Sequence, residues 1–243
     1  MHFIFSIEGN IGSGKSTLVK ILKTHTPQIE LKHFKFVYLP EPVDEWGKIK
    51  NESGVGILEE FYANPSKWAF SFQMMAYISR IAILKKTIKE NPHSIIISER
   101  SVYTDKNVFA KMLYDEKNIC EIDYQIYNKW FDEFVKDLPI SGLIYVNTSP
   151  DKCFERVNKR NRQGECIPLE YLTSCGNYHD EWISSHTNVL TLDGNIDFKE
   201  INNTNVLEEW IKNIVGFIDN TDSVKAQTAT FDLNLSDIMN IAC

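Results

Sequence analysis

Hydrophobic residues gather in five continuous runs, and between them lie longer segments in which apolar positions recur with a helical period. Because the runs are continuous and do not alternate with polar residues, they are typical of strands buried on both faces, as in a parallel sheet. Strands that alternate with helices predict βαβ units and a three-layer α/β fold. The strand-like runs cover residues 2–8, 34–39, 94–98, 142–147 and 188–193.

The segments between the runs predict helices over residues 14–24, 55–62, 66–90, 122–137, 150–161, 168–186 and 204–218. Two of these helices follow Asn-Pro-Ser and Ser-Pro-Asp, so Ser66 and Ser149 are the expected N-caps. The helical period weakens after residue 220. We therefore expect one domain over residues 1–220 and a C-terminal extension over residues 221–243.

The composition narrows the class of protein without naming a function. A chain of 243 residues is long enough for one α/β domain with a substantial core. Acidic residues outnumber basic ones by 33 to 26, which argues against polymeric nucleic acid as a partner, because that binding depends on Lys and Arg neutralising phosphates. Five cysteines without a C-x-x-C pair favour neither a disulfide framework nor a zinc site. With no stretch typical of a signal peptide or membrane span, we expect a cytoplasmic protein that does not bind membranes.

The clearest motif follows the first apolar run and opens the first predicted helix. Residues 9–16 read GNIGSGKS and match G-x-x-x-x-G-K-[ST], a loop whose backbone N–H groups hold the phosphates of a nucleoside triphosphate. Lys15 is expected on the outer phosphates, and the Ser16 hydroxyl is an expected ligand of Mg²⁺. The expected ATP-binding residues of this loop are Gly9, Asn10, Ile11, Gly12, Ser13, Gly14, Lys15, Ser16 and Thr17.

Other nucleotide-binding classes leave no matching motif. A switch GTPase usually carries N-K-x-D, and a motor ATPase usually has a longer chain and a strand that ends in Asp-Glu; the sequence has neither motif. These comparisons favour transfer of the terminal phosphoryl group to a small acceptor.

Charged residues follow the second and third apolar runs, at the edge of the sheet where ligands of open parallel sheets bind. Glu41 lies between Pro40 and Pro42, whose fixed φ angles restrict the direction of its carboxylate. Glu99 and Arg100 come directly after the third run. A carboxylate near a triphosphate can be a general base or an anchor for Mg²⁺, and an arginine can stabilise the charge on the transferred group. The alternative is an Arg–Glu pair that only caps the sheet.

The helix predicted over residues 66–90 carries two polar side chains on one face, Gln73 and Arg80, seven residues apart. A buried arginine needs a carboxylate or a polar ligand, and Asp105 is the candidate partner. An amide, an Arg–Asp pair and aromatic rings can stack on and hydrogen-bond a flat heterocycle. The neighbours expected to complete this pocket are Trp46, Phe72, Ala76 and Phe109.

Three arginines, Arg156, Arg160 and Arg162, are spaced along the end of one predicted helix and the loop after it. Arginines in this pattern can close over phosphates as a lid and exclude water, so that transfer is faster than hydrolysis. The alternative is a solvated charged face. We expect the lid over about residues 156–167.

Several stretches together resemble the deoxyribonucleoside kinases related to deoxycytidine and deoxyguanosine kinase: IEGNIGSGKST, PEPVDEW, NPSKWAFSFQ, ERSVYTD, IPLEYL and TLDGNIDFK. The resemblance covers residues 4–217. It implies the P-loop nucleoside kinase fold, with a five-stranded parallel sheet flanked by helices. It also implies ATP-dependent phosphorylation of a deoxynucleoside 5′-hydroxyl with Mg²⁺, and commonly a homodimer formed through helix packing.

The resemblance implies a role for individual residues at the acceptor side. Glu41 is similar to the base that takes the 5′-OH proton, Arg100 to the residue that steadies that oxygen and the phosphoryl group, and Glu99 to the carboxylate associated with Mg²⁺. With Lys15, Glu41 and Arg100 form the expected catalytic set. The implied substrate contacts are Tyr62 and Glu165 to the sugar 3′-OH and Gln73 to the base edge, with Trp46, Leu58, Phe72 and Phe109 around the ring.

The resemblance also implies the contacts of the donor and a preference among acceptors. Arg160 and Arg162 resemble the clamp on the ATP phosphates, Arg156 lies against adenine, and the loop with Asp193, Asp197 and Phe198 lines the adenine site. The trio Ala76, Arg80 and Asp105 resembles the deoxycytidine/deoxyguanosine type, which predicts deoxycytidine or purine deoxynucleosides over thymidine.

Two alternatives stay open at this point. A thymidylate-kinase-type nucleoside-monophosphate kinase shares the phosphate loop and an E-P motif, although its third strand usually ends in Asp-Arg and an aromatic residue. A nucleotide-binding regulator without catalysis would also keep the loop. The presence of Lys15, Ser16, Glu41, Glu99 and Arg100 argues against the regulator.

Overall fold

A five-stranded sheet forms the centre of the computed structural model, which describes residues 2–25, 31, 34–162, 164–197, 204–222 and 224–225. Its strands are β1 (His2–Glu8), β2 (Lys35–Leu39), β3 (Ser94–Glu99), β4 (Gly142–Asn147) and β5 (Val189–Asp193). All pairings are parallel, in the order β2-β3-β1-β4-β5. The predicted α/β class and the strands are therefore confirmed.

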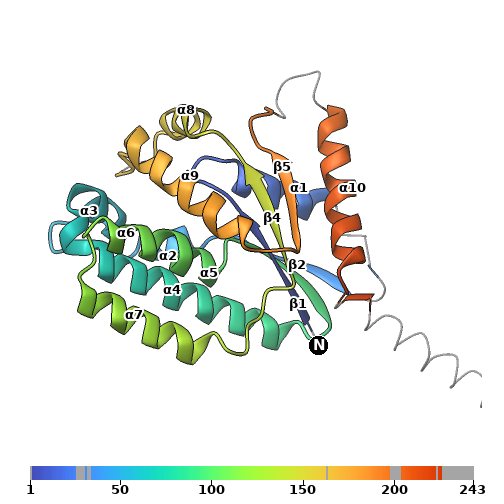
Figure 1. Cartoon of the computed structure of the whole chain (residues 1–243), viewed down its shortest axis with the longest axis horizontal. Helices are drawn as coiled ribbons and strands as arrows, with labels where there is room; N and C mark the ends of the chain where they lie inside the picture. Colours follow the sequence, from blue (N-terminus) through green and yellow to red (C-terminus); the bar gives the residue numbers. More distant parts are fainter. Residues whose placement is uncertain are drawn as a thin grey trace, which may run out of the picture.

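Helices cover both faces of this sheet (Figure 1). One face packs against α1 (Lys15–His25) and α10 (Thr204–Asn220). The other face packs against α4 (Pro65–Glu90), α7 (Glu121–Phe134) and α9 (Leu169–Ser184). The remaining helices are α2 (Val43–Trp46), α3 (Ile57–Ala63), α5 (Val102–Thr104), the π-helix η1 (Asp105–Ala110), α6 (Lys111–Asp115) and α8 (Pro150–Arg160).

The two covered faces explain why the strands are continuous apolar runs. Along β1, Phe3, Phe5 and Ile7 pack in the core beneath α1 and α10, whereas Ile4 packs in the core beneath α4 and α7. Successive side chains of a strand point to opposite faces, so both faces need apolar residues. Full burial of each such side chain contributes about 1.5–3 kcal/mol, and the central strand is therefore fixed from both sides.

Two helical stretches were not predicted. Helix α2 is a single turn after Pro42, too short to show a period. The run from α5 through η1 to α6 includes a π-helical turn, in which the buried Val108 is followed by Met112 and Leu113. A π-helix widens the turn beyond 3.6 residues, so the apolar spacing departs from the α-helical pattern.

One of the two expected N-caps is wrong. The Ser149 hydroxyl accepts a hydrogen bond from the Lys152 N–H (3.4 Å) and caps α8 as expected. In α4, however, the Asn64 side chain and not Ser66 accepts the bond from the Lys67 N–H (3.3 Å). Proline fits the first helical position because it has no N–H to satisfy, so the cap is the residue before it.

The chain after α10 continues into the core. Thr221 and Val224 are buried, and Val224 packs in the same core as α1 and α10. Residues 223 and 226–243 of the expected extension lie outside the described residues, so its boundary at residue 220 stays a prediction. Within the described ranges, no helix combines the length and the apolar character that crossing a bilayer requires.

Candidate active site

A cavity of about 800 Å³ lies beyond the carboxyl ends of the strands, where open parallel sheets bind their ligands. It runs from the loop between β1 and α1, past the residues that follow β2 and β3, to the N-terminal half of α4. The phosphate-binding loop of residues 9–16, the P-loop, and the charged residues after β2 and β3 therefore share one cavity, as the sequence predicted.

The P-loop passes so close to its neighbours that side chains are excluded at two of its glycines. A Cβ on Gly9 would lie 2.6 Å from the Val146 carbonyl oxygen, and one on Gly12 would lie 2.6 Å from the Cys153 carbonyl oxygen. Both glycines also have positive φ angles, +143° and +82°, which other residues rarely adopt. The loop is thereby held between β4 and α8 with its N–H groups free to converge on an anion.

Lys15 folds back onto this loop. Its ammonium Nζ donates to the Asn10 carbonyl oxygen (2.5 Å) and to the Ser13 hydroxyl (3.3 Å), and the residue is only 3% exposed. Burial, with a smaller contribution from the charge of Arg100, lowers the pKa of Lys15 to about 7. A polyanion in the loop would stabilise the charged form of this lysine.

Ser16 and Glu99 meet at the start of α1. The Ser16 hydroxyl donates to Glu99 Oε1 (2.5 Å), and Glu99 is buried. A hydroxyl and one carboxylate are oxygen ligands of the kind that Mg²⁺ takes from a protein when phosphate oxygens supply others. The two side chains therefore fit a magnesium ion shared with a nucleotide.

Glu41 lies between two arginines. Its Oε1 accepts from Arg80 Nη2 (3.0 Å), and its Oε2 accepts from Arg100 Nη1 (3.1 Å). Burial alone raises the pKa of Glu41, but the charges of Arg100 and Arg80, together with that of Lys15, outweigh it and lower the pKa to about 2. The carboxylate is therefore ionised at physiological pH, although its side chain is only 15% exposed.

Arg80 also makes the contact that the sequence predicted with Asp105. Its Nε donates to Asp105 Oδ2 (2.9 Å) and its Nη1 to the Glu99 carbonyl oxygen (2.9 Å). Both side chains are buried, with exposed fractions of 7% and 3%. One guanidinium thus joins α4, η1 and the ends of β2 and β3.

The wall beside Arg80 is aromatic and has one buried acceptor without a partner. Gln73 Oε1 is buried, and no described group of the protein donates to it. The ring of Phe72 meets that of Trp46 edge-on at 5.6 Å, and Phe109 lies 5.1 Å from the Arg100 guanidinium. A flat ligand bound between these rings would donate a hydrogen bond from its edge to Gln73 Oε1.

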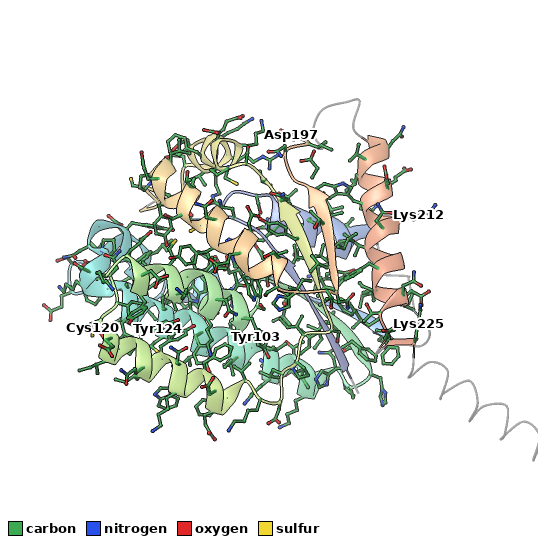
Figure 2. The ribbon with its side chains drawn as sticks, viewed as in Figure 1. Tyr103, Cys120, Tyr124, Asp197, Lys212 and Lys225 are labelled. Atoms are coloured by element: carbon green, nitrogen blue, oxygen red, sulfur yellow. The ribbon has the colours of Figure 1, made fainter. Side chains whose placement is uncertain are left out.

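The arginines of the expected lid have two kinds of partner. Arg160 Nη2 pairs with Glu165 Oε2 (2.6 Å), and Arg162 Nη1 lies 3.8 Å from Glu165 Oε1. Arg156 instead donates to backbone oxygens of Ser13 (3.2 Å), Gly194 (2.7 Å) and Ile196 (3.3 Å). Arg156 therefore ties the P-loop to the loop after β5, which carries Asp197 (Figure 2).

Most of the expected site residues line the cavity. Three do not, for local reasons. Gly9 lies against the backbone of β4, and the Asn10 amide turns away to the Leu172 carbonyl oxygen (2.7 Å). The Asp193 carboxylate accepts from the Asn195 N–H (3.0 Å) within its own turn. The expected residues that do line it are Ile11, Gly12, Ser13, Gly14, Lys15, Ser16, Thr17, Glu41, Trp46, Leu58, Tyr62, Phe72, Gln73, Ala76, Arg80, Glu99, Arg100, Asp105, Phe109, Arg156, Arg160, Arg162, Glu165 and Asp197. Phe198 lies outside the described residues.

Sequence reasoning also missed residues of this region. Asp44 and Tyr171 line the cavity, and both lie within stretches quoted for the resemblance, PEPVDEW and IPLEYL. Glu8 is a fully buried carboxylate directly before the P-loop. The sequence feature that could have revealed Glu8 is a charged residue at the end of a strand predicted to be buried on both faces.

Comparisons with known proteins agree with this geometry. Residues 5–216 match the family model described as deoxynucleoside kinase. The chain is 35% identical to deoxycytidine kinase 2 of Gallus gallus over 238 residues, which cover 85% of this chain and 86% of that protein. It is 35% identical to a probable deoxycytidine kinase of Fowlpox virus (89% and 88% covered) and 31% identical to the mitochondrial deoxyguanosine kinase of Xenopus laevis (75% and 73% covered). The chain therefore belongs to the deoxynucleoside kinase family.

Proposed function

We propose that this kinase transfers the terminal phosphoryl group of ATP to the 5′-hydroxyl of a deoxyribonucleoside. The observation that carries the proposal is the position of Glu41. Its ionised carboxylate lies in the same cavity as the P-loop and contacts Arg100, the residue that follows β3. A base for a hydroxyl and a cation for the phosphoryl group are thus adjacent, as in-line transfer requires.

The donor side of the reaction uses the P-loop. Its N–H groups and Lys15 bind the phosphates, and Arg160 and Arg162 close over them. Ser16 and Glu99 hold Mg²⁺, which neutralises charge on the phosphate oxygens. The adenine ring binds against Arg156 and the loop that carries Asp197.

The acceptor side uses Glu41 and Arg100. Glu41 accepts the proton of the 5′-hydroxyl as that oxygen forms a bond to the terminal phosphorus and the bond from phosphorus to the bridging oxygen of ADP breaks. Arg100 stabilises the negative charge on the transferred group. The products are a deoxynucleoside 5′-monophosphate and ADP.

The nucleoside is held at its sugar and its base. Tyr62 and Glu165 bind the 3′-hydroxyl, and Gln73 accepts a hydrogen bond from the base, which stacks between Phe72 and Phe109. Arg80 and Asp105 favour deoxycytidine or a purine deoxynucleoside over thymidine. The relatives compared above, deoxycytidine and deoxyguanosine kinases by name, support this preference.

A substrate panel tests the proposal. ADP release is measured with deoxycytidine, deoxyguanosine, deoxyadenosine, thymidine and dTMP as acceptors and ATP as donor. We expect turnover with the first three and a lower kcat/KM with thymidine. Turnover with dTMP alone would instead identify a nucleoside-monophosphate kinase, and ATP binding without turnover of any acceptor would identify a regulator.

We also propose that the protein is a homodimer formed through α4 and α7. Along α7, Ile122, Ile126, Trp130 and Phe134 are 38–71% exposed at intervals of four residues, and Ile78 of α4 is 52% exposed. Side chains at this spacing lie on one face of a helix, and an exposed apolar face of this kind is typical of an interface. A second copy packed on the same face would bury it.

A cytoplasmic location is also proposed. The four cysteines within the described residues are free thiols, and two of them, Cys153 and Cys175, are buried. Burial raises the pKa of both thiols, to about 11 and about 12, so they stay protonated and unreactive. A reducing compartment suits these residues.

A further inference from the structure

Glu8 is a buried carboxylate that lies behind the P-loop at the end of β1. Its exposed fraction is 0%, and burial raises its pKa, although hydroxyl donors and Arg100 oppose the rise. An unpaired carboxylate in such a place is costly, so its contacts indicate what it does.

Three hydroxyl groups donate to Glu8, and two of them come from the segment after β3. Ser101 Oγ donates to Oε1 (2.9 Å) and Thr104 Oγ1 donates to Oε2 (2.5 Å). The third donor, Ser6 Oγ, belongs to β1 itself and reaches Oε1 (2.5 Å). One carboxylate therefore joins the strand that leads into the P-loop to the start of α5.

Ser101 and Thr104 are the two partners of the capping box that begins α5. The Ser101 side chain accepts from the Thr104 N–H (3.3 Å), and the Thr104 side chain accepts from the Ser101 N–H (3.2 Å). Each hydroxyl thus accepts a hydrogen bond from a backbone N–H and donates one to the Glu8 carboxylate. The α5–η1 segment, which carries Asp105, is fixed to β1 at this point.

The same segment begins with a strained residue of the active site. Arg100 directly precedes Ser101 and has a φ of +61°, a strained conformation that non-glycine residues rarely adopt. Its N–H donates to the Ile7 carbonyl oxygen (3.0 Å) and its Nη2 to the Gly9 carbonyl oxygen (3.3 Å). Glu8 lies between these two acceptors in the sequence and holds the residue after Arg100.

We propose that Glu8 is a positioning residue for phosphoryl transfer: through Ser101 and Thr104 it fixes Arg100 and Asp105 relative to the P-loop. The inference rests on the proposed function, because Arg100 and the P-loop act together only in that reaction. Glu8 itself touches neither substrate.

The test compares Glu8→Gln and Thr104→Val with wild type by kcat, by KM for ATP and by thermal unfolding. Glutamine replaces one acceptor oxygen with an N–H₂ group, which then faces a hydroxyl that already donates. Valine keeps the shape of threonine and removes the hydroxyl. We expect kcat to fall at least tenfold in both variants with KM for ATP within twofold of wild type. Both changes break the same connection, the one between Glu8 and Thr104. The double variant should therefore have a kcat within about threefold of the kcat of the less active single variant.

Ser6→Ala is the matched control, because it removes a donor to the same carboxylate from the β1 side only. We expect a lower melting temperature and a kcat within twofold of wild type. If Glu8→Gln and Thr104→Val both unfold at lower temperature but keep wild-type kcat, Glu8 only stabilises the fold and the inference is wrong. If Glu8→Gln does not fold, the kcat of Thr104→Val decides. An inactive wild type would overturn the proposed function instead.

Discussion

At the scale of single residues, burial disfavours the charged forms of Glu41 and Lys15 alike, and their contacts decide the outcome. Glu41 keeps its charge because Arg80 and Arg100 contact it, and its pKa falls to about 2. Lys15 has no carboxylate within hydrogen-bonding distance among its described partners, and its pKa falls to about 7. Glu41 is therefore charged in the free protein, whereas Lys15 becomes fully charged only with a bound anion.

Replacement of Glu41 by Gln should lower kcat by about 10²–10⁴-fold, because the variant cannot accept the proton of the acceptor hydroxyl. The affinity for ATP, measured by calorimetry, should stay within twofold of wild type, since Glu41 acts on the acceptor. Glu45→Gln is the control: this carboxylate is 58% exposed and, within the described part of the chain, pairs with Lys48, so its loss should leave kcat unchanged. A Glu41→Gln variant with wild-type kcat would remove Glu41 from the mechanism.

The lowered pKa of Lys15 predicts that the protein takes up a proton when ATP binds. The ammonium is favoured by the phosphates, so a lysine with a pKa of about 7 in the free protein takes up a proton on binding at higher pH. The contribution of Lys15 should rise from about 0.1 proton at pH 6 to about 0.9 at pH 8, measured by calorimetry in buffers of different ionisation enthalpy.

The control for this experiment is Lys23→Gln, which removes an exposed lysine from the last turn of the same helix and should not change the uptake. Uptake that does not increase between pH 6 and pH 8 would show that Lys15 is already charged in the free protein.

At the scale of elements, the sequence was informative where a strand leads directly into a polar residue. Glu41, Glu99 and Arg100 follow buried strands, and parallel strands bring their carboxyl ends to one edge of the sheet, so their meeting could be expected. The direction of a side chain inside a turn could not. The motif placed Asn10 on the nucleotide, yet its amide turns to α9, because the acceptor is the Leu172 carbonyl oxygen, 162 residues away in the sequence, which a local motif does not reveal.

The π-helix η1 shows a second limit of the sequence. It carries Asp105 and Phe109, which both line the cavity, but its wider turn breaks the period from which helices are predicted. Pairing of Asp105 with Arg80 could still be expected from charge balance alone. Charge balance thus predicted the contact between Arg80 and Asp105, although the hydrophobic period did not predict the helix that carries Asp105.

The expected lid contains a glycine, Gly164, that lies against α3. A Cβ on Gly164 would lie 2.7 Å from Glu59 Cβ, at a φ of +75°. Gly164→Ala should therefore displace the lid and the adjacent Glu165, and we expect KM for the nucleoside to rise about five- to tenfold in steady-state assays.

Gly54→Ala separates the clash from backbone strain. Gly54 has a φ of +81°, but a Cβ there would meet nothing within 4 Å. This variant should lose stability through backbone strain alone and keep the wild-type KM. Equal KM values for the two variants would show that contact with α3 does not hold the lid.

At the scale of the whole molecule, the apolar face of α4 and α7 determines the expected assembly. Ile126→Glu with Trp130→Glu should convert the dimer to a monomer, because two carboxylates would be buried without partners at the interface. Light scattering after size-exclusion chromatography measures the mass. Ile49→Glu is the control, since Ile49 is 48% exposed outside this face and its replacement should leave the dimer intact. A wild-type mass near 28.1 kDa would contradict the dimer.

The strand order places residues of the cavity on both flanks of β1. On one flank, β2 and β3 supply Glu41, Glu99 and Arg100, and on the other, β4 and β5 lead into α8 and the loop held by Arg156. Under the proposed roles each flank serves both ligands, because Glu99 after β3 would hold Mg²⁺ with Ser16, and Glu165 after α8 would bind the 3′-hydroxyl. An exchange of one flank between relatives should therefore change donor and acceptor binding together.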